Sequence, residues 1–121
     1  MARHNELGQD GEEQACRYLT AKGYRIVHRN WRSGRHELDI VATDGEEYVF
    51  IEVKTRKGTE FGKPEDAVSN YKIRSIITAA DNYLRIFRID NPVRFDVIAI
   101  ISDGRQFKIK HYEEAFHSPI W

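Results

Sequence analysis

Two neighbouring segments of alternating apolar and polar residues constrain the fold of this chain most strongly. They run from Glu37 to Ala42 and from Tyr48 to Thr55, and the turn-forming residues 43–47 lie between them. Alternation with a period of two is typical of β-strands, and so short a connection predicts an antiparallel hairpin. If the apolar side chains of the two strands share their faces, Ile40 lies opposite Ile51. The sequence therefore predicts both a hairpin and its register.

The same register brings two carboxylates together. Asp39 falls directly opposite Glu52, and Lys54 shares the face of Glu52 two residues further along the strand. Opposed side chains lie about 5 Å apart, and like charges there cost stability. A compensating cation is therefore expected. Lys54 is one candidate, and a divalent ion, Mg²⁺ or Mn²⁺, is the stronger one because hard cations prefer carboxylate oxygens. The alternative is a solvent-facing strand on which Glu37 and Lys54 pair with each other.

Two further charged residues lie on or beside the apolar faces of predicted helices. The residues three, four and seven positions after Glu12 are apolar, so its carboxylate is expected to face the sheet. It is alternatively an ordinary acid near a helix start, where the helix dipole favours it. Lys72 shares its helical face with Val68 and Ile76. Its ammonium group would point toward a phosphate or the acids, or else extend into solvent.

The order of the predicted elements is helix, three strands, helix, two strands. The expected bounds are a helix over Glu6–Lys22, strands over Tyr24–Trp31, Glu37–Ala42 and Tyr48–Thr55, a loop over Arg56–Asp66, a helix over Ala67–Phe87, strands over Val93–Ile101 and Gln106–Tyr112, and a short helical tail. The nearly continuous apolar run of Val93–Ile101 predicts a central strand covered on both faces. We expect an α/β fold with a mixed sheet, and a single domain over residues 1–121.

Asp39, followed on the next strand by Glu52-Val53-Lys54, is the D…(D/E)xK arrangement, here with an acid on the leading helix. It resembles the restriction-endonuclease-like nuclease core. The chain is most similar to the YraN-like family of bacterial proteins with an expected endonuclease activity. The matching residues are Gly11-Glu12-Glu13, Ala15, Tyr18-Leu19, Gly23-Tyr24, Arg29-Asn30-Trp31-Arg32, Glu37-Leu38-Asp39-Ile40-Val41, Phe50-Ile51-Glu52-Val53-Lys54-Thr55-Arg56, Ala67-Val68, Lys72, Ala80, Tyr83-Leu84 and Arg94-Phe95-Asp96-Val97-Ile98.

The resemblance implies a restriction-endonuclease-like, three-layer mixed sheet. By the same resemblance, Glu12, Asp39 and Glu52 hold the metal, and Lys54 assists the hydrolytic water. The sequence departs from the family at His36, where family members usually carry glycine; this change leaves the carboxylates intact. Holliday-junction resolvases share this fold and act as dimers, so a homodimer is an expectation on this ground.

A local excess of basic residues accompanies these acids. The whole chain has 19 Lys+Arg and 19 Asp+Glu, so a nucleic-acid partner has to be met by a local patch. Residues 14–36 contain six basic residues and no acid. Arginines and lysines that position a phosphate backbone are expected around the metal centre. The candidate contacts are Arg29, Arg32, Arg35, Arg56 and Lys72. Much of the segment is alternatively a solvated strand face.

These features favour a metal-dependent endonuclease that hydrolyses phosphodiester bonds in DNA, with branched or structured DNA as the expected substrate. One alternative is a non-catalytic nucleic-acid-binding module with the same fold, and another is an adaptor whose long helix packs on a partner. No apolar run approaches the ~20 residues of a membrane span, and the first residues lack a hydrophobic signal segment. The lone Cys16 excludes an internal disulfide and favours a reducing cytoplasm.

Overall fold

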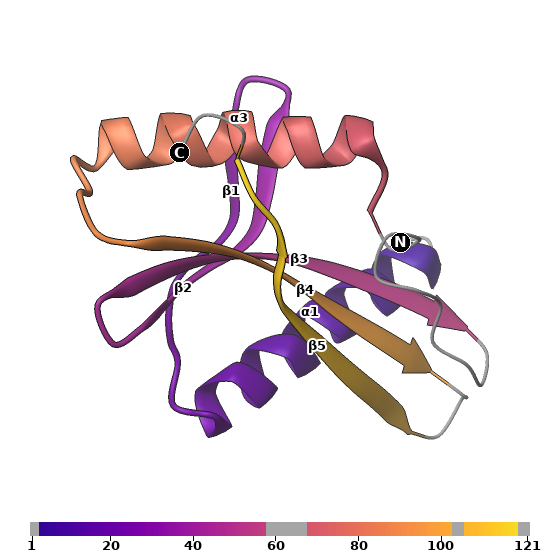
Figure 1. Cartoon of the computed structure of the whole chain (residues 1–121). Helices are drawn as coiled ribbons and strands as arrows, with labels where there is room; N and C mark the ends of the chain where they lie inside the picture. Colours follow the sequence, from indigo (N-terminus) through magenta and orange to yellow (C-terminus); the bar gives the residue numbers. More distant parts are fainter. Residues whose placement is uncertain (1–2, 58–67, 103–105, 119–121) are drawn as a thin grey trace.

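The computed structural model describes residues 3–57, 68–102 and 106–118 (Figure 1). Within these residues the predicted order of helix, three strands, helix and two strands is confirmed. The elements are α1 (Arg3–Ala21), β1 (Arg25–Ser33), β2 (His36–Asp44), β3 (Glu47–Lys57), α3 (Asn70–Ile86), β4 (Val93–Ser102) and β5 (Phe107–Phe116).

The strands form one mixed sheet in the order β1-β2-β3-β4-β5. Strands β3 and β4 are parallel, and all other neighbours are antiparallel. The segment that contains α3 connects the two parallel strands. Figure 1 shows α1 on one side of the sheet and α3 on the other. The predicted three-layer α/β architecture is therefore confirmed.

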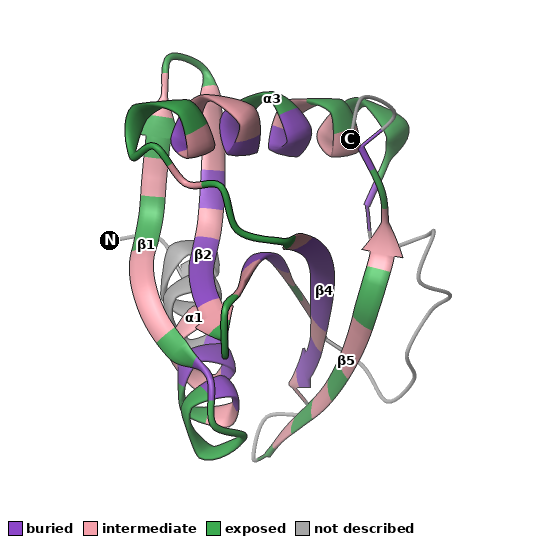
Figure 2. Cartoon of the chain, turned by 60° about the vertical axis from the view of Figure 1, so that its left-hand side comes forward, coloured by how far each residue is buried: buried purple, intermediate pink, exposed green. Residues whose placement is uncertain are grey.

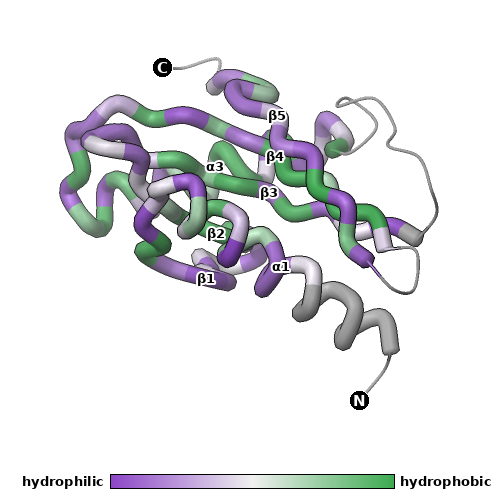
Figure 3. Tube along the Cα trace, turned by 90° about the horizontal axis from the view of Figure 1, so that it is seen from below, coloured by the Kyte–Doolittle hydropathy of each residue, from purple (hydrophilic) through white to green (hydrophobic). Residues whose placement is uncertain are grey.

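Each helix covers a hydrophobic core of its own. Under α1, Leu19 packs with Ile40 and Ile51, whereas under α3 the ring of Tyr83 packs with Phe50. The buried residues of β4 contribute to both cores, which confirms its prediction as a strand covered on two faces. Figure 2 shows β4 as mostly buried, and in Figure 3 the trace of β3 and β4 is largely hydrophobic while that of β1 is largely hydrophilic. No helix of the described residues is long and apolar enough to cross a membrane.

A glycine allows α1 to lie directly against β3. A Cβ atom at Gly11 would come within 2.0 Å of Cγ2 of Thr55, which is far closer than two carbon atoms can approach. With any larger residue at this position, either the helix or the Thr55 side chain would have to move. The close packing also fixes the position of Glu12, the next residue of the helix.

The β1–β2 hairpin leaves the sheet and reaches α3. The pairing of β2 with β3 starts at the β2–β3 turn and ends at Ile40 opposite Ile51, while β1 and β2 stay paired as far as Ser33 and His36. At this end of the hairpin, Nδ1 of His36 lies 2.8 Å from Oγ of Ser75 on α3. Two-stranded ribbons twist strongly. Leu38 consequently packs in the core under α3 and not, as its alternation with Ile40 predicts, in the core under α1.

Three predicted boundaries need correction. The helical tail is wrong, because β5 continues to Phe116. The loop expected over Arg56–Asp66 begins later, since β3 extends through Lys57; residues 58–66 lie outside the described residues. Helix α3 begins at Asn70 because the Ser69 side chain accepts a hydrogen bond from the backbone N–H of Lys72 and caps the helix. Ala67, the expected start, lies outside the described residues.

Candidate functional site

The first predicted acid lies where β2 and β3 separate. The register that the sequence predicts is confirmed from the turn to the pair Ile40–Ile51. One residue further on, Oδ2 of Asp39 accepts a hydrogen bond of 2.9 Å from the backbone N–H of Val53. The carboxylate thus occupies the place at which a backbone carbonyl of β2 would continue the ladder. This contact fixes Asp39 beside Glu52, the residue that precedes Val53.

Glu52 is a buried acid next to this carboxylate. Its exposure is only 8%, because it points from β3 toward the side of the sheet that α3 covers. Burial, together with the hydrogen bond to Asp39 and the charge of Asp39, raises the pKa of Glu52 to about 9. Lys72 and Lys54 lower it by a smaller amount. Without a further cation, the Asp39–Glu52 pair therefore carries one proton at neutral pH.

Both predicted lysines are near the buried acid. Nζ of Lys72 lies 3.8 Å from Oε2 of Glu52, so this side chain points toward the acids and not simply into solvent. Lys54 is exposed and shares the face of Glu52 on β3. The alternative pairing of Glu37 with Lys54 is wrong, because Glu37 pairs with Arg32 at 3.1 Å.

Glu12 of α1 lies near Asp39, one member of the pair. Burial and the charge of Asp39 raise its pKa, whereas Arg29 and a hydrogen bond from Asn30 lower it. Its Oε1 atom is buried and has no hydrogen-bond partner among the described residues. A buried, unpaired carboxylate oxygen is costly. A bound cation would satisfy this oxygen, so the surroundings of Glu12 are compatible with a cation site.

The three acids fit a divalent ion in part. Among the described residues, no three His, Cys, Asp or Glu side chains are gathered closely enough to form a complete metal cluster. Mg²⁺ in phosphate-processing sites usually takes one or two carboxylates and completes its shell with water and substrate oxygens. Asp39 and Glu52 meet that requirement, and Glu12 is close enough to Asp39 for the charge of Asp39 to raise its pKa. The role of Glu12 as a third ligand stays a prediction.

The structure divides the predicted basic residues between different places. Arg56 and Lys72 line a cavity of about 440 Å³ next to Glu52. Arg29 of β1 points toward α1, where its NH1 atom is 3.0 Å from Oε1 of Glu13. Arg32 and Arg35 lie on the end of the β1–β2 hairpin, and Arg35 is exposed. The cavity next to Glu52 is lined by Glu52, Val53, Lys54, Arg56, Val68, Ser69, Tyr71 and Lys72.

Among the described residues, two cavities of similar size lie away from these acids. One, of about 490 Å³, is formed by the end of α3 and the ends of β4 and β5, and the other, of about 500 Å³, lies between α1 and β1. Neither is lined by Asp39, Glu52 or Lys54. Of these three cavities in the described part of the chain, the one beside Glu52 combines a paired carboxylate with several cations.

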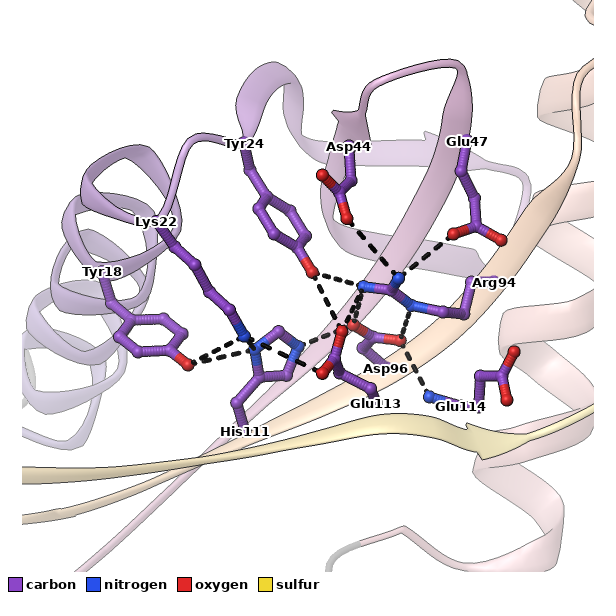
Figure 4. Close-up of polar contacts among 10 residues, drawn as sticks. All are labelled: Tyr18, Lys22, Tyr24, Asp44, Glu47, Arg94, Asp96, His111, Glu113 and Glu114. Atoms are coloured by element: carbon purple, nitrogen blue, oxygen red, sulfur yellow. Dashed lines mark hydrogen bonds and ion pairs between the residues drawn. The ribbon is translucent and has the colours of Figure 1, made fainter.

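A second buried polar cluster was missed by sequence reasoning (Figure 4). Asp96 on β4 is completely buried and accepts hydrogen bonds of 2.8 Å from Nε and NH2 of Arg94. Nε2 of His111 donates a third hydrogen bond of 2.6 Å, and the backbone N–H of Glu114 a fourth. Burial acts to raise the pKa of Asp96, but these hydrogen bonds outweigh it and hold the pKa below its usual value.

The arginine of this cluster joins several elements. Arg94 donates to Tyr24 before β1 and, at 3.1 Å, to Glu47 at the start of β3. It also lies 3.2 Å from Glu113 of β5. Because every charged member has a partner, the cluster is a structural connection between the strands. The signal in the sequence is the pair of charges that interrupts the apolar run of β4.

Comparisons with known proteins identify relatives of the whole chain. A protein of Phocaeicola vulgatus is 58% identical and one of Bacteroides thetaiotaomicron is 52% identical, and each match covers 100% of both chains. Both are called UPF0102 proteins. Among solved structures, a Holliday junction resolvase from Archaeoglobus fulgidus is similar with a TM-score of 0.49 and 23% identity, over 84% of this chain and 72% of that chain. The model of the uncharacterised protein family UPF0102 matches residues 11–100. The chain therefore belongs to the UPF0102 family, the YraN-like family that its motifs indicate.

Proposed function

We propose that this protein is a divalent-metal-dependent nuclease that hydrolyses phosphodiester bonds in DNA. The observation that carries the proposal is the close approach of the carboxylates of Asp39 and buried Glu52 where β2 and β3 separate, which raises the pKa of Glu52. Such a pair is costly to maintain in a core and is typical of functional sites. We place the protein in the cytoplasm, where its single cysteine would remain reduced.

The residues around the pair have separate tasks in this proposal. Asp39 and Glu52 would hold Mg²⁺ or Mn²⁺, which when bound supplies an activated water and stabilises the charge that develops on the phosphate. Nζ of Lys54 would hold the attacking water by a hydrogen bond. Arg56 and Lys72, which line the same cavity, would hold the phosphate backbone in position.

A cleavage assay tests the proposal. Labelled linear, flapped and four-way-junction DNA is incubated with the protein and Mg²⁺ or Mn²⁺, with Asp39→Ala and Glu52→Ala as site variants. Glu46→Ala is the matched control, because this acid is exposed in the β2–β3 turn. We expect cleavage by the wild type and by the control, and none by the two site variants or with EDTA. Equal cleavage by all four proteins would show a contaminating nuclease and would overturn the assignment.

A second candidate function is nucleic-acid binding without hydrolysis. It is favoured by Lys72, whose ammonium group already faces Glu52 at 3.8 Å and balances part of its charge. Calorimetric titration with Mn²⁺ separates the two functions. Uptake of Mn²⁺ that is lost in Asp39→Ala supports the nuclease, whereas salt-dependent DNA binding with no Mn²⁺ uptake supports the binding module.

A further inference from the structure

One aromatic side chain is exposed at the edge of the cavity beside Glu52. Tyr71 lies in the first turn of α3 and its exposure is 81%. The other large apolar residues exposed in the described part of the chain, Ile86 and Phe87, lie at the opposite end of this helix. The ring of Phe87 packs 4.6 Å from that of Tyr83, whereas no described aromatic ring packs against Tyr71. Tyr71 thus adds nothing to the core.

The surroundings of this ring are basic. Tyr71 lines the cavity together with Lys54, Arg56 and Lys72. All three cations are at least partly exposed, and Lys72 has 43% of its side chain exposed. The volume of about 440 Å³ is within the range of sites that bind small molecules or parts of larger ones. A flat apolar ring and several cations therefore face the same space.

We propose that Tyr71 stacks on an unpaired nucleobase, and that the substrate of this site has a single-stranded segment next to the bond to be cut. This inference rests on the proposed nuclease function and specifies its substrate class. Single-stranded nucleic acid is bound by a basic groove that follows the phosphates and by aromatic rings that stack on the bases. Continuous duplex offers no such contact, because its bases are already stacked inside the helix and only phosphates and groove edges are outside.

The position of Tyr71 agrees with this occupant. Figure 1 shows the start of α3 on the same side of the molecule as the C-terminal end of β3, which carries Lys54 and Arg56. A strand whose phosphates contact these two residues would present its next base toward α3. The unpaired base would then be held on one side of the acids while the adjacent phosphate faces Glu52.

Binding without cleavage tests the proposal. In EDTA and at low salt, fluorescence anisotropy measures the affinity for a single-stranded oligonucleotide, for an abasic oligonucleotide of the same length and for continuous duplex. The proteins are the wild type, Tyr71→Ala, Tyr71→Phe and, as the matched control on the same helix, Ile86→Ala, which removes another exposed apolar side chain. Because both positions are exposed, neither substitution is expected to disturb folding.

We expect Tyr71→Ala to weaken single-strand binding by about 5- to 100-fold, the usual effect of losing one stacking ring. Tyr71→Phe and Ile86→Ala should bind as the wild type does, and the abasic oligonucleotide should bind equally to the wild type and Tyr71→Ala. Equal affinity of Tyr71→Ala and the wild type for the single strand would overturn the role of Tyr71 and leave the nuclease intact. An equal loss on the abasic oligonucleotide would also overturn it, since the ring would not be reading a base. A wild type that binds none of the three would overturn the nuclease and this inference together.

Discussion

Replacement of Glu52 by glutamine is expected to stabilise the metal-free protein at pH 7. Burial and Asp39 raise the pKa of Glu52 to about 9, whereas the unfolded chain ionises it near 4.5. Between these values the folded protein binds a proton that the unfolded chain releases, so its free energy of unfolding falls by about 1.4 kcal/mol for each pH unit. Glutamine keeps the shape of the side chain and has no such proton. Between pH 4.5 and pH 7 the difference in the free energy of unfolding therefore grows to about 3 kcal/mol in favour of Glu52→Gln.

Urea unfolding in EDTA at pH 5, 7 and 8 measures this difference. At pH 5 the two proteins should differ by less than about 1 kcal/mol, and the gap should widen at pH 7 and again at pH 8. Glu46→Gln is the control for the loss of one negative charge, because Glu46 is exposed in a turn. A Glu52→Gln protein that is no more stable than the wild type at pH 7, or a gap that does not change with pH, would refute the reasoning.

Three further predictions concern the site and the packing around it. Uptake of Mn²⁺ at pH 7 should release about one proton from Glu52, so the affinity for Mn²⁺ should rise by up to tenfold for each unit of increasing pH. Calorimetry in buffers of different ionisation enthalpy measures the released proton. A heat of Mn²⁺ binding that does not depend on the buffer would contradict the prediction. Gly11→Ala should lower the free energy of unfolding by about 1–3 kcal/mol because the new Cβ would lie 2.0 Å from Cγ2 of Thr55. Adding Thr55→Ser, which removes this methyl group, should restore part of the loss. An unchanged free energy of unfolding in Gly11→Ala would contradict the close packing. Asp96→Asn should cost about 3 kcal/mol or more in urea unfolding, since it leaves the buried guanidinium of Arg94 with only more exposed carboxylates as charged partners, and unchanged stability would show that the cluster is dispensable.

The hairpin and its acids could be predicted because local pattern decides them. A slip of one residue would move Ile40 and Ile51 from one face of the sheet to the other, so the apolar alternation fixes the register. Once that register is fixed, the approach of Asp39 to Glu52 follows. The separation of β2 and β3 at this point could not be predicted from the sequence. The hydrogen bond from the backbone N–H of Val53 to Asp39 could therefore not be predicted either.

The end of β5 could not be predicted from alternation. Phe95 of β4 pairs with Phe116, but Val97 pairs with Tyr112, so β5 contains extra residues between two pairs. Glu114 in this bulge has a positive φ of 50°. Such an insertion interrupts the period of two from which a strand is recognised, and the segment therefore resembled a helical tail.

The buried charges of β4 depend on contacts that are distant in the sequence. Arg94 and Asp96 are read correctly as part of a strand, yet their partners come from the segment before β1, the start of β3 and β5. No local pattern joins these elements. The exposed position of Tyr71 could not be predicted either. It depends on how α3 lies relative to the end of β3, and these two elements are distant in the sequence.

The most direct test of the paired-carboxylate site is a crystal structure of the protein with Mn²⁺, in which anomalous scattering locates the ion. We expect one peak between the carboxylates of Asp39 and Glu52, at a distance of about 2.0–2.3 Å from an oxygen of each, and no peak there in crystals of Asp39→Asn. A wild-type crystal at saturating Mn²⁺ that shows no peak at these oxygens, or a peak only at another site, would contradict the account.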